Sequence, residues 1–121
     1  MKQLFLWSLL LILLDQVTKY FFVQTINYGA AFGLFQGGRW VFIVISIFVL
    51  LFLLFYQHHV KTWGVYGMIF LFSGLVGNLI DRLFLGYVRD FIDVGFWPVF
   101  NLADTYATIG VIILIFYFWR K

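Results

Sequence analysis

The 121-residue sequence contains no cysteine, no glutamate and a single proline, and only 11% of its residues are charged. The absence of cysteine excludes disulfides, thiolate metal sites and a cysteine nucleophile. The two histidines, His58 and His59, are adjacent and do not face one site from a helix, so we predict neither a metal site nor a cofactor. The net charge of +3 is small and spread along the chain, which argues against a nucleic-acid partner.

Most residues of the chain are apolar. They account for 64% of the chain, and the mean hydropathy is +1.03. The uncharged runs approach the roughly 20 residues that a helix needs to cross a bilayer. We therefore predict an all-α membrane protein, with the lipid bilayer as its surroundings and one domain over residues 1–121. Its four transmembrane helices should cover about residues 4–22, 40–56, 63–80 and 102–119.

Two of the connections between these spans are polar and long enough to form structure of their own. Residues 24–39 are rich in glycine and other small residues, and residues 81–100 contain most of the acidic groups and the proline. Apolar and polar residues alternate from Tyr87 to Val94, which indicates a short strand or an interfacial segment. We expect these two connections to form a small extracytoplasmic element, with short β-strands, beside the helices.

Four spans place both termini on one side of the membrane. The basic residues divide equally between the two sides, so the positive-inside rule does not set the orientation by count. Arg82 and Arg89 are interleaved with Asp81, Asp90 and Asp93, however, and so belong to a site rather than to an orientation signal. We accordingly predict that both termini are cytoplasmic.

All five acidic residues are aspartates, and a carboxylate in or beside a bilayer is costly enough to mark a functional site. Asp15 interrupts the first span and has Lys19 four residues later, the spacing of an ion pair on one helix face. That pair fits a structural role and a substrate-positioning role equally well. Asn78 carries an amide inside the third span, where it needs hydrogen-bonding partners.

Three of the remaining four aspartates lie within the 81–100 connection, and the fourth follows it. Two carboxyl groups that share one proton can hydrolyse a peptide bond, as in aspartic proteases. Asp104 also has a structural explanation, because Asn101 and Asp104 resemble the capping box that begins a helix. Residue patterns alone leave open which two carboxyl groups pair among Asp81, Asp90, Asp93 and Asp104.

Two other functional classes compete with a peptidase. A small proton-coupled transporter would use Asp15 as one indispensable acid deep in a span. A purely structural membrane anchor would leave Asn78, Asp81, Asp90 and Asp104 without a role. The clustering of acids at one interface, beside asparagine and arginine, favours the peptidase.

Five motifs, in order along nearly the whole chain, resemble those of the signal peptidase II family, the bacterial lipoprotein signal peptidases. The first is Asp15-Gln16-Val17-Thr18-Lys19, and Asn27 to Gly33 matches N-x-G-A-A-F-G. Three more follow: Gly74 to Arg82 (G-x-x-G-N-x-x-D-R), Val88 to Asp93 (V-x-D-F-I-D) and Phe100 to Asp104 (F-N-x-A-D). Only seven residues separate Lys19 from Asn27, so the sequence resembles a short member of the family.

This resemblance implies an aspartic endopeptidase of the bacterial cytoplasmic membrane, with its active site near the outer face. The substrate would be a diacylglyceryl-modified prolipoprotein, and the enzyme would act as a monomer. The implied catalytic pair is Asp90 and Asp104. The implied substrate-binding or supporting residues are Asp15, Lys19, Asn27, Asn78, Asp81, Arg82, Asn101 and Ala103.

Overall fold

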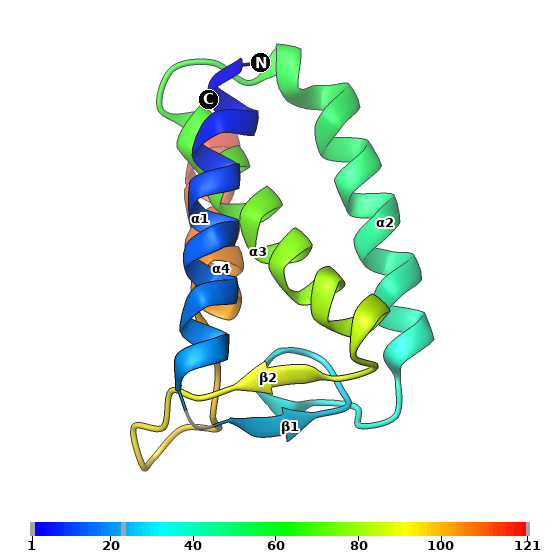
Figure 1. Cartoon of the computed structure of the whole chain (residues 1–121). Helices are drawn as coiled ribbons and strands as arrows, with labels where there is room; N and C mark the ends of the chain where they lie inside the picture. Colours follow the sequence, from blue (N-terminus) through cyan, green and yellow to red (C-terminus); the bar gives the residue numbers. More distant parts are fainter. Residues whose placement is uncertain (1, 23, 121) are drawn as a thin grey trace.

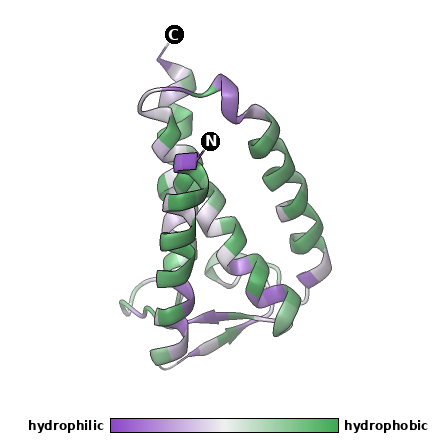
Figure 2. Cartoon of the chain, turned by 45° about the horizontal axis from the view of Figure 1, so that its top comes forward, coloured by the Kyte–Doolittle hydropathy of each residue, from purple (hydrophilic) through white to green (hydrophobic). Residues whose placement is uncertain are grey.

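Four helices and a two-stranded sheet make up the computed structural model, which describes residues 2–22 and 24–120 (Figure 1). Each of the four helices is long and apolar enough to cross a membrane, which confirms the predicted fold class. Their apolar side chains give the long faces of the molecule a hydrophobic surface (Figure 2). The helices are α1 (Lys2–Phe21), α2 (Arg39–Tyr56), α3 (Gly64–Phe84) and α4 (Leu102–Trp119).

Helix α3 is longer than its sequence predicted. The hydropathy of the chain placed its end near residue 80, whereas the helix continues to Phe84. Asp81 and Arg82 therefore lie within the helix instead of following it as an exposed charged stop, and both are buried. Burial of these charges is possible because other charged and polar groups surround them, a condition that hydropathy does not measure.

The small sheet forms as expected from the two polar connections, but its strands are short. Strand β1 (Thr25–Asn27) pairs antiparallel with β2 (Val88–Asp90), and Thr25 lies opposite Asp90. Only three residues of the predicted alternating segment become a strand. A 3₁₀ helix, η1 (Ala31–Gly33), follows β1, and another, η2 (Gln57–His59), follows α2.

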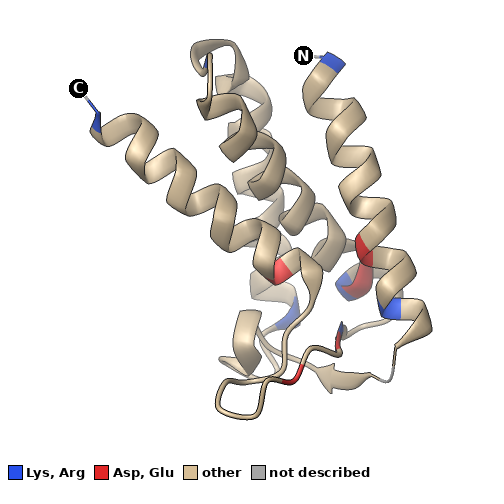
Figure 3. Cartoon of the chain, turned by 90° about the vertical axis from the view of Figure 1, so that its left-hand side faces the viewer, with Lys and Arg blue, Asp and Glu red and all other residues tan. Residues whose placement is uncertain are grey.

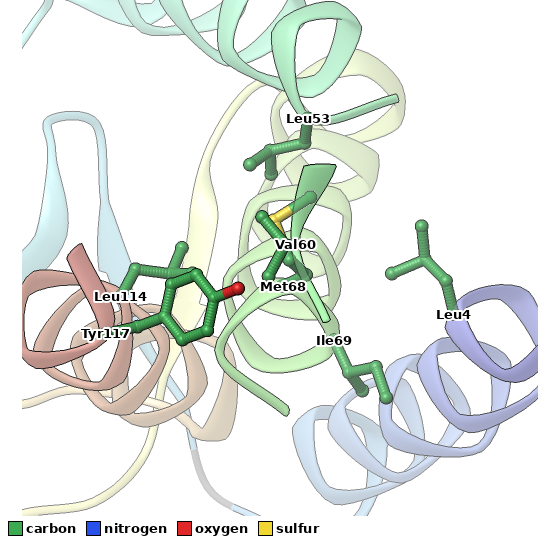
Figure 4. Close-up of a cluster of buried hydrophobic side chains, with 7 residues drawn as sticks. All are labelled: Leu4, Leu53, Val60, Met68, Ile69, Leu114 and Tyr117. Atoms are coloured by element: carbon green, nitrogen blue, oxygen red, sulfur yellow. The ribbon is translucent and has the colours of Figure 1, made fainter. Parts of the chain in front are cut away.

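The sheet lies across one end of the helices, and both termini lie at the opposite end (Figure 1). We call these the sheet end and the terminal end. A cluster of buried apolar side chains fills the interior at the terminal end (Figure 4). It consists of Leu4, Leu53, Val60, Met68, Ile69, Leu114 and Tyr117. The interior at the sheet end is instead polar, and many of its buried side chains are charged groups and amides.

Helices α3 and α4 approach each other closely because glycines face the contact. A Cβ atom on Gly74 would lie 2.4 Å from the carbonyl oxygen of Ala103. A Cβ atom on Gly110 would lie 2.4 Å from the backbone nitrogen of Leu71. Small residues permit this backbone approach, which is how helices associate where lipid offers no hydrophobic driving force. The contact fixes the N-terminus of α4 against the second half of α3.

Replacement of Gly110 by alanine should destabilise the protein, although alanine is the better helix former by about 1 kcal/mol. The new methyl group would meet the backbone of Leu71, which cannot move aside as a flexible side chain can. We expect Gly110→Ala to lower the Tm in detergent by several degrees, measured by thermal unfolding. Ile112→Ala, on the exposed face of α4, serves as the control. An unchanged or higher Tm for Gly110→Ala would contradict the close contact.

Candidate active site

The acidic residues gather at the sheet end, whereas no acidic residue lies near either terminus (Figure 3). Asp15 is in the second half of α1, Asp81 is near the end of α3, and Asp90 ends β2. Asp104 is in the first turn of α4. All four are almost completely buried, at 0–2% exposure. Four separate elements therefore bring carboxyl groups into one interior region.

The N-terminus of α4 is closed by a capping box, as the sequence indicated. The Asn101 side chain accepts a hydrogen bond from the Asp104 backbone N–H at 2.8 Å. In return, the Asp104 carboxylate accepts one from the Asn101 backbone N–H at 3.1 Å. The structural explanation for Asp104 is therefore correct, but it occupies only one oxygen of the carboxylate. The other oxygen, Oδ1, faces a second group.

Asn78 binds that second oxygen. Its Nδ2 donates to Asp104 Oδ1 at 3.0 Å, and its own Oδ1 accepts from Asn101 Nδ2 at 3.1 Å. Lys19 also donates to Asn78 Oδ1, at 3.0 Å. The amide that the sequence places inside an apolar span thus finds all its partners within the site. It fixes the side chain of Asp104 from the direction of α3.

Asp90 is held by two amides. Asn101 Nδ2 donates to one of its oxygens at 2.8 Å, and Asn27 Nδ2 donates to the other at 3.1 Å. Burial, together with the nearby negative charge of Asp104, raises the pKa of Asp90 to about 7. The two amide hydrogen bonds act in the opposite direction and limit this rise. Asp90 thus holds a proton at a pH where an ordinary aspartate is ionised.

A group of ion pairs lies beside these two aspartates. The Lys19 ammonium group is 2.8 Å from the Asp15 carboxylate and 3.3 Å from that of Asp81. The predicted i, i+4 pair is therefore present, with a third member. The second oxygen of Asp15 accepts from the backbone N–H of Ala103 at 2.9 Å. Asp15 thus connects α1 to the N-terminus of α4, where a negative charge is favoured.

Gln16 was not among the predicted site residues, and Arg89 was assigned to a site only through its neighbouring aspartates, without a partner. Arg89 donates to both oxygens of Asp81 through its side chain and also through its backbone N–H at 3.0 Å. Gln16 donates to Asp81 and to the Gly77 carbonyl oxygen, and accepts from Arg89 at 2.7 Å. Both residues stand inside the quoted motifs. The sequence offered no means of telling that their side chains face Asp81.

The loop after β1 is ordered by side chains that also reach the site. Asn27 Oδ1 accepts from the Gly29 backbone N–H and from Gln36 Nε2, each at 2.8 Å. Arg82 donates to the Gly29 carbonyl oxygen at 3.0 Å. Gln36 is a further site-supporting residue that sequence reasoning missed, because no spacing links it to Asn27. These bonds position the loop over the region of Asp90 and Asp104.

Asp93 lies apart from the other acids. It is exposed, and its carboxylate accepts from the Gly95 backbone N–H at 2.9 Å, in a local turn. Asp81, by contrast, is paired with Lys19 and Arg89. Of the four acids around the 81–100 connection, Asp90 and Asp104 are thus the two that are buried without an ion-pair partner in the described part of the chain.

A small cavity of about 190 Å³ opens between α2, α3 and the loop after β1. Asp104, Asn78 and Arg82 form its polar wall, and three larger apolar side chains together with small residues form the rest; the three are Phe42, Ile45 and Leu75. Such a space can admit an extended backbone to the Asp104 carboxyl group. Among residues 2–22 and 24–120, no group of three or more His, Cys, Asp or Glu side chains is placed to hold a metal ion.

Known proteins share this fold. Two solved structures, both described as bacterial membrane enzymes, have nearly the same fold. One has a TM-score of 0.91 at 29% identity, covering 99% of this chain and 89% of the other. The second has a TM-score of 0.82 at 30% identity, covering 100% and 95%. The fold is therefore that of these bacterial membrane enzymes, and its four long apolar helices are those of a multi-pass membrane protein.

The family follows from the sequence comparisons. The family model described as signal peptidase (SPase) II matches residues 7–120. A lipoprotein signal peptidase of Halothermothrix orenii is 50% identical over 100 residues, which are 78% of this chain and 67% of the relative. Another, of Streptococcus pyogenes serotype M5, is 36% identical over 99% of this chain and 95% of the relative. The chain belongs to the signal peptidase II family, membrane proteases that cleave signal peptides from prolipoproteins.

Two substitutions should move the pKa of Asp90 in opposite directions. Asn101→Ala removes a hydrogen bond that lowers this pKa, and should therefore raise it further. Asp104→Asn removes a like charge that raises the pKa, and should lower it. The measurement is a pH titration of the aspartate carboxyl carbons by NMR, with ¹³C-labelled protein in detergent. Shifts of the same sign in both variants would contradict the described arrangement.

Proposed function

We propose that this chain is an aspartic endopeptidase that removes the signal peptide from diacylglyceryl-modified prolipoproteins, with Asp90 and Asp104 as its catalytic pair. One observation carries the proposal. Asn101 bonds to both carboxylates, one through its side chain and one through its backbone. Asp15 and Asp81 already have cationic partners, and Asp93 is exposed. These surroundings support the pair that the family motifs imply.

The charges of the buried region favour one proton on this pair. The cations that face it are the buried Lys19 and Arg82 and the half-buried Arg89, and its buried acids are Asp15, Asp81, Asp90 and Asp104. Four carboxylates opposite three cations leave one negative charge in excess. A buried region of low dielectric disfavours such an excess, and a single proton on the pair removes it. One ionised and one protonated carboxyl group is the state that hydrolysis by two aspartates requires.

Cleavage would then proceed by water attack. The ionised carboxylate takes a proton from a water molecule, whose oxygen bonds to the scissile carbonyl carbon. The protonated carboxyl group gives its proton to the carbonyl oxygen, so that a neutral tetrahedral intermediate forms. When this collapses, the second aspartate takes back a proton from one of the two hydroxyl groups as the carbonyl re-forms. The carbon–nitrogen bond breaks, and the leaving nitrogen takes a proton from the first aspartate. The pair returns to its starting state with one proton.

The neighbouring residues would support this chemistry rather than perform it. Asn27 and Asn78 each hold one of the two carboxylates by a donated hydrogen bond. Arg82 and Lys19 supply compensating positive charge, and Arg82 also lines the cavity. Ala103 contributes only a methyl group to the close contact between α4 and α3. That methyl group lies 3.1 Å from the position that a Cβ atom on Gly77 would occupy.

The position of the cavity suits a membrane-bound substrate. It opens beside α2, whose apolar side chains are mostly exposed and would face lipid. A signal peptide helix and a diacylglyceryl group both partition into hydrocarbon, so they can reach the cavity from within the bilayer. We propose that the sheet end lies at the outer face of the bacterial cytoplasmic membrane, with both termini cytoplasmic. A monomer contains all of the described site, and no metal enters the mechanism.

Asp90→Asn and Asp104→Asn should each reduce cleavage by about 100-fold or more, because each removes one of the two proton-transfer groups. The measurement is the gel shift of a purified diacylglyceryl prolipoprotein, with thermal unfolding to check the fold. Asp93→Asn is the matched control and should cleave at close to the wild-type rate, since Asp93 is exposed. Undiminished cleavage by either of the first two variants would remove that residue from the pair. Loss of cleavage in Asp93→Asn would assign the chemistry to a different acid.

Cleavage should also decline as the pH rises above about 7. With the pKa of Asp90 at about 7, a higher pH removes the shared proton and leaves two carboxylates with no acid between them. Well above this pKa, the rate should fall by about tenfold for each pH step of one. Initial rates measured from pH 5 to 9 would test this. A rate that keeps rising through pH 9 would exclude a shared proton from the mechanism.

A further inference from the structure

Ser46 is a buried polar residue in a helix that is otherwise almost entirely apolar. Every other residue of α2 from Val41 to Phe55 is apolar. The Ser46 side chain is only 4% exposed, and it lines the cavity of about 190 Å³ that also contains Asp104. A hydroxyl group in such surroundings is costly unless it forms a hydrogen bond. The role of Ser46 therefore depends on what its hydroxyl group can bind.

The Ser46 hydroxyl group has no hydrogen-bonding partner within residues 2–22 and 24–120. A hydroxyl group on a helix can donate to a carbonyl oxygen one turn earlier in the same helix. Four side chains of the other long helices do so: Thr18, Ser73, Thr105 and Thr108. Ser46 does not, although α2 offers it a carbonyl group at the same spacing. Its hydroxyl group is therefore available to a molecule that enters the cavity.

The level of Ser46 along the helices differs from that of the proposed catalytic pair. Helices α2 and α3 run in opposite directions, and Arg39 at the start of α2 donates to the carbonyl oxygen of Arg82 at 2.8 Å (Figure 1). From that contact, Ser46 is seven residues along α2, or about 10 Å toward the terminal end. Asn78, which binds Asp104, is four residues along α3, or about 6 Å. Ser46 thus lies about one helical turn closer to the terminal end.

The cavity wall around Ser46 leaves room for a peptide backbone. Gly74 of α3 and Ala107 of α4 line the cavity, as do Ala30 and Ala31 of the loop after β1. None of these residues carries a side chain larger than a methyl group. Small residues permit a close backbone approach, so the main chain of a bound peptide can come within hydrogen-bonding distance of the Ser46 hydroxyl group.

A signal peptide would present carbonyl groups at this level, an argument that rests on the proposed function. Residues before the scissile bond would extend toward the terminal end, which we propose to be cytoplasmic. The last four carbonyl groups of a helix have no partners within it, and leaving them unpaired in apolar surroundings is costly. Asn78 and Arg82 also line the cavity but already donate to Asp104 and Gly29. Ser46 is a donor that has no such commitment.

We propose that Ser46 is a substrate-positioning residue, whose hydroxyl group donates a hydrogen bond to a backbone carbonyl oxygen of the signal peptide. One helical turn, about 5 Å, corresponds to one or two residues of extended chain or three of helix. The acceptor is therefore the carbonyl of the second, third or fourth residue before the scissile bond. The bond satisfies both groups and sets which peptide bond lies beside Asp90 and Asp104.

Steady-state cleavage of a synthetic diacylglyceryl lipopeptide, by the purified protein in detergent, tests this role. The contact is remote from the reacting bond and stabilises the bound substrate and the transition state alike. Ser46→Ala should therefore raise KM by about fivefold, the effect of one hydrogen bond, and leave kcat within about twofold. Ser73→Ala is the matched control, because it removes a buried hydroxyl group that already donates to the Ile69 carbonyl oxygen. It should have the wild-type KM.

The two ways in which this experiment could fail are distinguishable. An active wild type with an unchanged KM in Ser46→Ala, or with an equal increase in Ser73→Ala, would overturn the role of Ser46 alone. Absence of cleavage by the wild type would overturn the proposed peptidase function, and with it the substrate that Ser46 is proposed to bind.

A series of modified substrates separates direct contact from a structural effect of the substitution. Peptide bonds whose carbonyl belongs to the second, third or fourth residue before the scissile bond are replaced, one at a time, by an alkene. One replacement should raise KM by about fivefold in the wild type and cause no further increase in Ser46→Ala. Equal increases in both proteins would overturn the direct contact. An ether-linked lipid that shows this dependence on Ser46 instead would assign the acceptor to the diacylglyceryl group and overturn the backbone contact.

Discussion

The side chain of Asn101 is the connection on which the order of the polar interior depends. Its oxygen begins α4 by accepting from Asp104, and its nitrogen holds Asp90 of β2 and contacts Asn78 of α3. One amide thus sets the start of a helix, the end of a strand and the orientation of two carboxylates. In a buried site its loss would leave several polar groups unsatisfied, each at a cost of about 1–3 kcal/mol. The proposed catalytic geometry and the local fold therefore share the same bonds.

A second constraint is that charged side chains buried away from water must be paired with opposite charges. Lys19 stands between Asp15 and Asp81, and Arg89 binds Asp81 from the strand. These pairs are possible because glycines bring the helices together. A Cβ on Gly77 would come within 2.5 Å of the Asp15 carboxylate. Close helix packing and electrostatic neutrality are thus coupled, and the proposed pair of aspartates is what remains outside the ion pairs.

Much of the fold could be predicted because it rests on local properties of the chain. Long apolar runs predicted four helices, and the α4 boundaries were correct because Asn101 and Asp104 form a recognisable cap. The end of α3 was wrong, since a buried arginine and aspartate look like a stop when their partners are unknown. Gln16, Gln36 and the pairing of Arg89 with Asp81 were missed for a similar reason. Gln16 bonds to Arg89 and Asp81, 73 and 65 positions away, and Gln36 bonds to Asn27, 9 positions away, and no sequence spacing indicates these contacts.

The sequence by itself determined the membrane environment, the helices, the absence of thiol chemistry and, through five ordered motifs, the resemblance to a protease family. These follow from composition, hydropathy and short-range pattern, which act through neighbouring residues. Only the tertiary structure decided how four acids around one connection differ. It buried Asp90 and Asp104 among amides, paired Asp81 with cations and left Asp93 exposed. The reason is physical: the protonation of a carboxyl group depends on its burial and its neighbours, and both are set by helix packing across the whole chain.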